Sequence, residues 1–353
     1  MRVAVVAPNY APAVGGVETV VTQVARHLVA LGCTVEVWTH RPPGHAALPA
    51  DDDGVTVRRF AATPSARYPW SPALWRHTIR QAGAFDVVHA HSYHSTAAAG
   101  IALRRLPVPV VFTTHYHGVG HTRAAQAMHR AYGPIGGRLL ARADAVVAVS
   151  AAEETLLHND FPAVAGRTAV VANGVDSRRL AAAAPWPDEP PTLLVAGRLE
   201  PYKRVDRVIE AFGRLASAGQ LVVVGDGPDR SRLERLAGPG VRFAGRVDDD
   251  DLARWLRTAR GVVSLSAHEA FGLVAAEGVA AGARAVLSDI PAHREVAAML
   301  GDAASVVDAG DPDAVAAALD RALTMPNEGP RAVRNWRDVA ADYLALYERV
   351  VSR

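Results

Sequence analysis

The chain has 353 residues, half of them hydrophobic, a length that fits two compact domains better than one. Its 38 lysine and arginine residues face 36 acidic ones, and the net charge of +2 gives no electrostatic reason to expect nucleic acid or an anionic membrane as the main partner. The single Cys33 excludes an intramolecular disulfide and fits a reducing cytoplasm, where we expect the protein.

The N-terminus indicates a first strand and not a signal peptide. Residues 1–8 are a short apolar run that ends in proline and lacks the longer apolar region and cleavage site of a secretory signal. No run of about 18 uncharged apolar residues follows anywhere, so the sequence predicts no membrane-spanning helix.

Short apolar runs alternate with amphipathic segments along the chain, a pattern typical of βα units around parallel sheets. In the first half we predict helices such as 18–31 and 122–142, and strands at 3–7, 35–39, 55–60, 87–91, 108–113, 145–149 and 168–172. The proline-rich stretch 181–191 has no periodicity and predicts a linker.

The βα pattern restarts after this stretch, with predicted strands at 193–196, 221–224, 241–244, 262–265 and 285–288 and a last helix at 336–350. We therefore expect an α/β protein with domains at 1–176 and 192–330, a linker at 177–191 and a C-terminal segment at 331–353. Ligands of open α/β sheets bind beyond the carboxyl ends of the strands, so a cleft between two Rossmann-like domains is the expected site.

The loop after the first strand, 8–18, carries Gly15 and Gly16 just before a helix. Glycines there let backbone N–H groups approach an anion at the helix N-terminus. The spacing matches neither G-x-G-x-x-G nor a P-loop, and a plain turn is the alternative.

The segment 196–206 follows a strand and opens a helix at Val205, which places Arg198 and Lys203 on one loop. Lys203 is the only lysine among the 38 basic residues. Two cations at a strand's carboxyl end can clamp a diphosphate as it leaves, whereas the alternative is surface ion pairing with Glu200 or Asp206.

Two carboxylates, Glu269 and Glu277, flank the start of a later helix that Gly272 and Leu273 begin. An anion can rest on this helix N-terminus, with the carboxylates accepting hydrogen bonds from hydroxyls on either side. Paired carboxylates also occur in glycosidases, but two helical turns separate these by about 12 Å along the axis, which argues against that chemistry.

Seven of the fourteen histidines fall between His89 and His129. A metal site there lacks a nearby cysteine and any carboxylate beyond Asp86, so hydrogen-bond contacts of His91 and His115 with donor or acceptor are favoured. The acidic runs 51–53 and 248–251 resemble metal-binding Asp-x-Asp motifs, but we expect both to be solvated, the second at the start of a helix over 252–259.

The segment 67–76 mixes arginines with tyrosine and tryptophans. It predicts acceptor recognition or ordinary packing, and peripheral membrane contact is a less favoured alternative.

Five motifs in this order together resemble glycosyltransferase family 4, whose members are retaining enzymes of GT-B fold that use nucleotide sugars. They are the Gly-Gly-Val-Glu run 15–18, the Asn-Gly-Val-Asp run 173–176, Arg198 with Lys203, the Gly-Asp-Gly-Pro run 225–228, and Glu269 and Glu277 around Phe271-Gly272-Leu273. The likeness covers nearly the whole chain, and the end, 335–347, resembles the family's last helix, which crosses back to the acceptor-binding N-terminal domain. The sequence departs from the family's usual residues at Cys33, Val279 and Ala283. It also departs at 290–295, where the family frequently has a glycine-rich turn.

The resemblance implies a role for each matched position. Arg198 and Lys203 hold the donor diphosphate, and the N–H of Gly16 faces its β-phosphate. Glu277 binds the ribose hydroxyls, Glu269 holds hydroxyls of the transferred sugar, and His115 lies near the sugar's 6-hydroxyl. Backbone groups at Phe271, Gly272 and Leu273 support the sugar and phosphate, those at Arg246 and Val247 edge the base, and the predicted binding set is completed by Gly15, His91, Asn173 and Gly197.

We therefore expect a retaining hexosyltransferase that moves a sugar from a UDP- or GDP-sugar to a hydroxyl of a natural product, polysaccharide or glycolipid. We expect no cofactor and no obligatory divalent metal, and the sequence predicts no oligomeric state. A nucleotide-sugar epimerase or a sugar phosphorylase of the same fold is the enzymatic alternative, and a non-catalytic nucleotide-sugar binding protein is the other.

Overall fold

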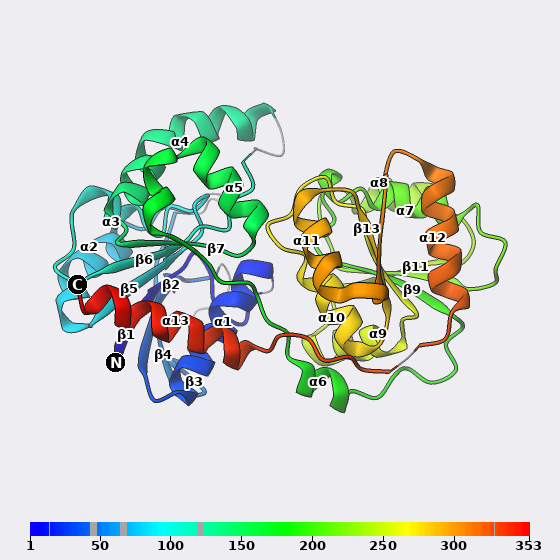
Figure 1. Ribbon diagram of the computed structural model, residues 1–353, viewed down its shortest axis with the longest axis horizontal. Helices are drawn as coiled ribbons and strands as arrows, with labels where there is room; N and C mark the ends of the chain where they lie inside the picture. Colours follow the sequence, from blue (N-terminus) through cyan, green and yellow to red (C-terminus); the bar gives the residue numbers. More distant parts are fainter. Residues whose placement is uncertain (14, 43–47, 64–68, 119–122, 328) are drawn as a thin grey trace. The chain divides into compact units, whose positions relative to one another are not determined.

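The computed structural model describes residues 1–13, 15–42, 48–63, 69–118, 123–327 and 329–353, and of residues 123–131 it describes the backbone only. The chain forms two compact units (Figure 1). Unit 1 is Met1–Asn173 with Trp336–Arg353, and unit 2 is Gly174–Asn335. Arg67 and Tyr68 of the aromatic segment, the start of the predicted helix at Thr122, and His121 lie outside the described residues.

Unit 1 is built on a sheet that has eight strands within the described residues, in the order β3-β4-β2-β1-β5-β6-β7-β8. All neighbours are parallel except β3 and β4, which pair antiparallel. The strands are β1 (Arg2–Val6), β2 (Thr34–His40), β3 (Asp51–Asp52), β4 (Val55–Phe60), β5 (Val87–His91), β6 (Val110–Thr113), β7 (Ala145–Ala148) and β8 (Thr168–Val170).

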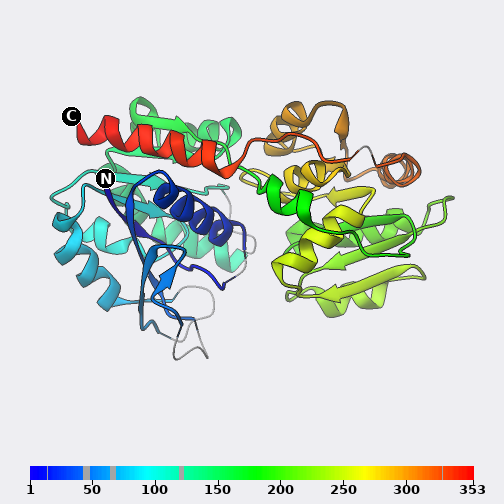
Figure 2. The same cartoon turned by 90° about the horizontal axis from the view of Figure 1, so that it is seen from below.

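The central strands of this sheet are buried along their length, as expected for a parallel sheet with helices on both faces. The helices are α1 (Gly16–Ala30), α2 (Pro72–Gln81), α3 (Ala99–Leu103), α4 (Arg123–Arg142), α5 (Ala151–Asp160) and α13 (Trp336–Val351), with short 3-10 turns η1 (Ala82–Ala84) and η2 (Pro162–Arg167). The last helix, α13, packs beside α1, as Figure 2 shows, so the end of the chain completes unit 1.

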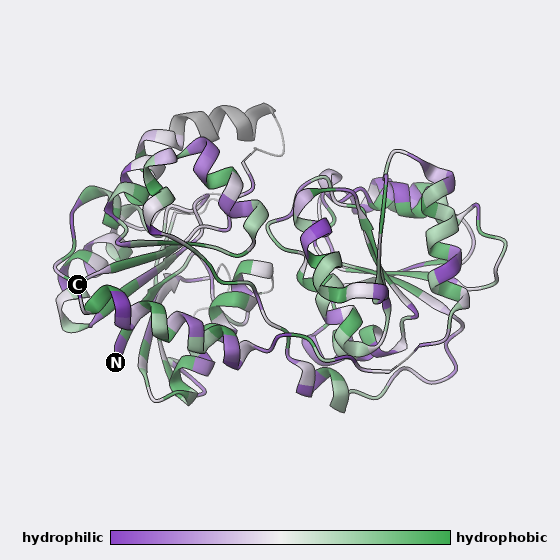
Figure 3. Cartoon of the chain, viewed as in Figure 1, coloured by the Kyte–Doolittle hydropathy of each residue, from purple (hydrophilic) through white to green (hydrophobic). Residues whose placement is uncertain are grey.

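Unit 2 has a parallel sheet of six strands in its described residues, in the order β11-β10-β9-β12-β13-β14. The strands are β9 (Thr192–Ala196), β10 (Gln220–Val224), β11 (Val241–Gly245), β12 (Gly261–Ser264), β13 (Arg284–Ser288) and β14 (Ala304–Val307). The helices are α6 (Ser177–Ala182), α7 (Val205–Phe212), α8 (Arg230–Leu236), α9 (Asp249–Thr258), α10 (Leu273–Ala281), α11 (Pro291–Leu300) and α12 (Pro312–Thr324), with 3-10 turns η3 (Pro201–Lys203) and η4 (Gly301–Ala303). In Figure 3 the strands of both sheets are largely hydrophobic, while helices such as α12 and α13 carry both colours.

The predicted α/β class with two Rossmann-like parallel sheets is confirmed. Two strands escaped prediction: β3, formed by aspartates of low strand propensity, and β14, a short edge strand. The predicted linker 177–191 is not structureless, because the carboxylate of Asp176 accepts the N–H of Arg179 at 3.1 Å and starts α6. Further along it, Trp186 packs against Trp255 with ring centroids 5.8 Å apart, which attaches the proline-rich stretch to unit 2.

The strand order in each sheet reverses direction at one point, and there the loops beyond neighbouring strands diverge and leave room for a ligand. In unit 1 this point lies between β1 and β5, and in unit 2 it lies between β9 and β12. The loop with Gly15 and Gly16 follows β1, and His91 ends β5. The loop with Lys203 follows β9, and the loop with Glu269 follows β12.

Candidate active site

The centre of the candidate site in unit 2 is an ion pair between Lys203 and Glu269. Lys203 Nζ lies 2.5 Å from Glu269 Oε1, and the two side chains are 25% and 18% exposed. The two loops are also joined by a backbone hydrogen bond of 2.7 Å from the N–H of Ala267 to the carbonyl of Tyr202. The predicted cation and the predicted carboxylate are therefore held together by both side chains and backbone.

Each member of this pair sustains the charge of the other. Burial disfavours the charged ammonium of Lys203, but the Glu269 carboxylate outweighs it, so the pKa of Lys203 is raised. Burial likewise favours a neutral Glu269, yet the charge and hydrogen bond of Lys203 lower the pKa of that carboxyl. The site thus holds one positive and one negative group side by side at neutral pH.

Arg198 lies on the same loop as Lys203 but does not join this pair. Its side chain is 72% exposed, and Nε lies 3.0 Å from Glu200 Oε1, which is the surface pairing considered as the alternative. Glu200 is mostly buried, but the Arg198 guanidinium is open to solvent, so an anion with more negative charge can reach it.

The Gly-Asp-Gly-Pro run 225–228 shapes the loop that carries these cations. Gly225 has φ of +123°, and a Cβ added to it would lie 1.9 Å from the carbonyl oxygen of Gly197. The N–H of Leu199 donates to the carbonyl of Asp226 at 3.0 Å. Gly225 is therefore required by the close backbone approach of the two loops.

The helix start expected at Gly272 and Leu273 is found. Gly272, with φ of 117° in the left-handed region, is the N-cap of α10, and Phe271 before it is buried. Glu277 is the fifth residue of α10, closer to the helix start than two full turns. Its carboxylate forms no hydrogen bond or ion pair within the described part of the chain, and burial followed by the charge of Asp249 raises its pKa to about 7.

The second acidic run, 248–251, acts on Glu277 through the charge of Asp249. The helix expected after this run starts earlier than predicted. Asp248 caps α9 by accepting the N–H of Asp251 at 2.9 Å, but the helix begins at Asp249, three residues before the predicted start. Asp249 and Asp250 are exposed and pair with Arg179 at 3.1 and 3.0 Å. The predicted base-edge residues Arg246, exposed, and Val247, partly exposed, follow the end of β11 just before this run.

In unit 1 the structure brings His91 and His115 together. His91 Nδ1 lies 3.3 Å from His115 Nε2, and the rings stack with centroids 5.6 Å apart. Burial lowers the pKa of His115 to about 4, and burial followed by the neighbouring histidines lowers that of His91, so both rings are neutral at physiological pH. His91 Nε2 is buried and has no partner among the described residues.

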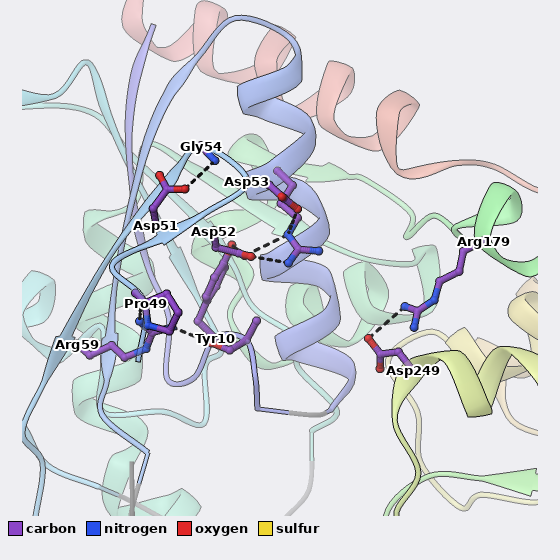
Figure 4. Close-up of polar contacts among 11 residues, drawn as sticks. Tyr10, Pro49, Asp51, Asp52, Asp53, Gly54, Arg59, Arg179 and Asp249 are labelled. Carbon is purple, nitrogen blue, oxygen red and sulfur yellow. Dashed lines mark hydrogen bonds and ion pairs between the residues drawn. The ribbon is translucent and has the colours of Figure 1, made fainter. Parts of the chain in front are cut away.

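The loop between β1 and α1 is tethered to the edge of the sheet. Tyr10 donates to Asp52 Oδ2 at 2.7 Å, Arg26 Nη2 reaches Asp52 Oδ1 at 2.5 Å, and Arg59 Nη2 donates to the carbonyl of Ala11 at 2.9 Å (Figure 4). The expectation that the run 51–53 is solvated is therefore wrong for Asp52, whose side chain is 23% exposed, because Arg26 on α1 pairs with it.

Gly15 precedes α1 as predicted, but the helix begins at Gly16, two residues before the predicted start. A carboxylate lies against this helix start already: a Cβ added to Gly15 would come within 2.3 Å of Glu18 Oε2, and Asn9 Nδ2 donates to Glu18 Oε1 at 2.9 Å. The described part of the helix start therefore places an acidic side chain where a negative group is favoured.

Two family models match the chain, one after the other. The model of "Glycosyltransferase Family 4" matches residues 14–179, and that of "Glycosyl transferases group 1" matches residues 176–339. A D-inositol 3-phosphate glycosyltransferase of Jonesia denitrificans is 30% identical over 95% of this chain and 91% of its own length. The chain belongs to glycosyltransferase family 4.

Two further relatives come from Mycobacterium tuberculosis. A phosphatidyl-myo-inositol mannosyltransferase is 30% identical to this glycosyltransferase over 99% of the chain and 97% of its own, and a GDP-mannose-dependent alpha-mannosyltransferase is 31% identical over 100% and 98%. The structure of sucrose-phosphate synthase from Thermosynechococcus elongatus superposes with a TM-score of 0.80 at 22% identity, each chain being covered to 99%. An Anabaena protein solved with UDP and glucose gives 0.71 at 16% identity, over 99% and 95% of the two chains. These likenesses show the GT-B fold.

One residue of the glycosyltransferase site escaped sequence analysis. His293, on α11, is fully buried behind the Glu269 loop: Ser288 Oγ lies 2.9 Å from its Nδ1, and the same hydroxyl donates to the carbonyl of Ser266 at 2.6 Å. Its ring also limits the space at Gly272, where an added Cβ would be 3.4 Å from His293 Cδ2. The only sequence signal was its place in 290–295, where the family's glycine-rich turn is replaced.

The predicted positions of the glycosyltransferase that remain are Asn173 and the aromatic segment. Asn173, the last residue of the first part of unit 1, is buried and its Oδ1 has no partner among the described residues. Trp70 is half exposed and packs on Trp75, whose Nε1 donates to the carbonyl of Thr96 at 2.7 Å. Roles of this aromatic segment in acceptor or membrane binding stay predictions. Within the described residues, no helix has both the length and the apolar character needed to cross a membrane.

Proposed function

We propose that this glycosyltransferase acts with retention and takes its sugar from a UDP- or GDP-sugar. The observation that carries the proposal is the Lys203–Glu269 pair, held at the point where the strand order of unit 2 reverses. A relative named for its dependence on GDP-mannose and a structural neighbour solved with UDP and glucose support a nucleotide sugar as donor.

Each part of the donor would engage a different group of unit 2. Lys203, which is mostly buried, and Arg198, which is exposed, supply positive charge for the diphosphate, and the N-terminus of α10 at Gly272 supplies N–H groups. Glu269, kept ionised by Lys203, accepts from sugar hydroxyls. Glu277 has no partner within the described residues and is available to the ribose hydroxyls.

The reaction breaks the bond between the sugar's anomeric carbon and the phosphate oxygen and forms a bond from the same face to the acceptor oxygen. The acceptor's hydroxyl proton passes to the departing phosphate. Lys203 and Arg198 stabilise the charge that develops on that phosphate, which is the largest contribution we assign to the protein. His115 of unit 1 is neutral, so a hydrogen bond from it to the sugar's 6-hydroxyl, the role that the family resemblance implies, would add no charge.

No divalent metal is needed in this proposal, because the two cations neutralise the leaving group. The acidic runs that resemble metal motifs have other partners: Asp52 pairs with Arg26, and Asp249 and Asp250 pair with Arg179.

The decisive experiment has a binding and a product arm. Thermal unfolding with a panel of UDP- and GDP-sugars identifies the donor, because a ligand specific for the folded state raises the melting temperature. The bound donor is then incubated with acceptors that include inositol phosphate and phosphatidylinositol, chosen from the names of two relatives. NMR of the product should show the anomeric configuration of the donor. An inverted product refutes retention, an epimer formed from donor alone indicates an epimerase, and sugar phosphate formed from a disaccharide and phosphate indicates a phosphorylase.

A further inference from the structure

Glu153 is a buried carboxylate that the proposed reaction does not use. It is the third residue of α5 and only 2% exposed. Ser150 caps the helix, its Oγ accepting the N–H of Glu153 at 3.0 Å. A glutamate three residues after such a cap usually returns to the cap's own N–H, but this one reaches into two other segments.

Three donors converge on this carboxylate. Oε1 accepts from the hydroxyl of Thr114 and, at 2.5 Å, from the N–H of Tyr116, and Oε2 accepts from the N–H of Val149 at 2.7 Å. Thr114 and Tyr116 are the two neighbours of His115 in the chain. The carboxylate therefore ties both sides of His115 to the end of β7.

The backbone of His115 needs such support. Its φ is +48°, in the left-handed region that residues other than glycine rarely adopt. The next side chain is held by the same helix, since Tyr116 donates its hydroxyl to Asp160 Oδ2 at 2.7 Å. A strained conformation persists where its surroundings determine it fully, and Glu153 adds two side-chain hydrogen bonds, from Thr114 and Tyr116, to the backbone bonds that Thr114 makes with Val147 and Tyr93.

We propose that Glu153 is a positioning residue that, through Thr114 and Tyr116, holds His115 in the conformation that presents its imidazole to the transferred sugar. The inference rests on the proposed role of His115. This role differs from that of a plain helix cap. Two of the three hydrogen bonds of Glu153 join it to the loop after β6, and only the bond from Val149 lies at the start of α5.

The ionised form of Glu153 is the one that fits these donors. Burial raises its pKa to about 7, and the three hydrogen bonds act in the opposite direction. Protonation on Oε2 would set an O–H against the N–H of Val149 and break that bond, and protonation on Oε1 would reverse the bond with the hydroxyl of Thr114. Among the described residues, the titratable groups on the elements around it are His115, Tyr116 and His117 on the loop, Glu154, His158 and Asp160 on α5, and Arg167 on η2, which donates to the carbonyls of Ala141 and Ala143; β7 and β8 carry none.

The test compares Glu153→Gln with Glu154→Gln, which removes the same charge one residue away in the same helical turn. We expect Glu153→Gln to lower kcat at least tenfold at pH 8.5 with donor KM changed less than threefold. At pH 6, where a pKa of about 7 leaves Glu153 mostly protonated, the two proteins should differ less than threefold. Glu154→Gln should stay within twofold throughout. A ratio of wild type to Glu153→Gln that does not vary with pH indicates general structural damage and overturns the inference.

A second readout needs no turnover. The imidazole resonances of His115, assigned by comparison with His115→Ala, should move in Glu153→Gln and stay in place in Glu154→Gln. If Glu153→Gln does not fold, Thr114→Val removes one donor and should move the same resonances. Unmoved resonances in the folded variant overturn the inference. Moved resonances together with a fully active His115→Ala would instead uphold the positioning and refute the proposed role of His115.

Discussion

Replacing Glu277 by glutamine should stabilise the protein at alkaline pH while weakening its use of the donor. The pKa of Glu277 is raised from 4.5 to about 7, mainly by burial and next by the charge of Asp249. A carboxyl whose pKa is higher in the folded than in the unfolded state contributes stability that is fully present below the unfolded pKa. That contribution is lost as the pH rises from about 4.5 through about 7.

The size of this loss follows from the shift. The difference between the two pKa values corresponds to about 3 kcal/mol at most, and partial exposure of the side chain reduces it, so we expect about 1 to 3 kcal/mol. Glutamine keeps the shape of the side chain and carries no charge. The variant should therefore melt higher than the wild type by roughly 2 to 10 °C at pH 8.5 and by much less at pH 5.

The assay is thermal unfolding of both proteins without donor at the two pH values. Glu153 also has a pKa raised to about 7, but it is present in both proteins and cancels in the comparison. Glu154→Gln controls for the loss of one negative charge. The reasoning is refuted if Glu277→Gln melts below the wild type at pH 8.5. It is also refuted if the difference in melting temperature is the same at both pH values. In turnover, losing a charged acceptor of the ribose hydroxyls should raise donor KM about 10- to 100-fold.

Three further predictions concern two loops of unit 2 and the need for a divalent metal. Lys203→Ala should lower turnover at least about a hundredfold, because it removes charge from the leaving diphosphate and leaves Glu269 buried without its partner; near-normal steady-state rates would contradict the donor site. Gly225→Ala should destabilise the protein by about 3 kcal/mol or more, since the added Cβ would lie 1.9 Å from the carbonyl oxygen of Gly197, whereas Gly238→Ala, with nothing within 4 Å, should melt within about a degree of wild type. Dialysis against EDTA should leave at least half of the activity, and a loss that Mg²⁺ restores would show that a metal takes part.

The sequence predicted what depends on short, regular patterns. Apolar runs located the β9 and β12 strands to within a residue or two, and the position of Lys203 and Glu269 after them placed both at the same end of the sheet. Their direct contact did not follow from spacing alone, since 66 residues separate them in the chain. It required the strand order that puts β9 beside β12.

What sequence analysis missed depends on distant partners. Glu153 looks like an ordinary first-turn glutamate, and its role appears only because Tyr116, 37 residues away, points its N–H at the carboxylate. Asp52 looks solvated until Arg26 and Tyr10 are seen to reach it from other elements. His293 had no expected role because the turn around it departs from the family's pattern.

The chain passes between the two units twice, and the passages run side by side. The N–H of Val175 donates to the carbonyl of Arg334 at 2.8 Å, and Val175 and Asn335 form a parallel bridge. Unit 2 is therefore one uninterrupted stretch of chain inserted into unit 1, whose own two pieces end next to this bridge. For protein engineering, residues 174–335 are therefore one continuous block, and joining them to another unit 1 requires only the two junctions after Asn173 and before Trp336. A separate unit 1, in contrast, needs a short connection from Asn173 to Trp336, because without α13 the buried rings of Tyr343 and Tyr347 would be missing from its core.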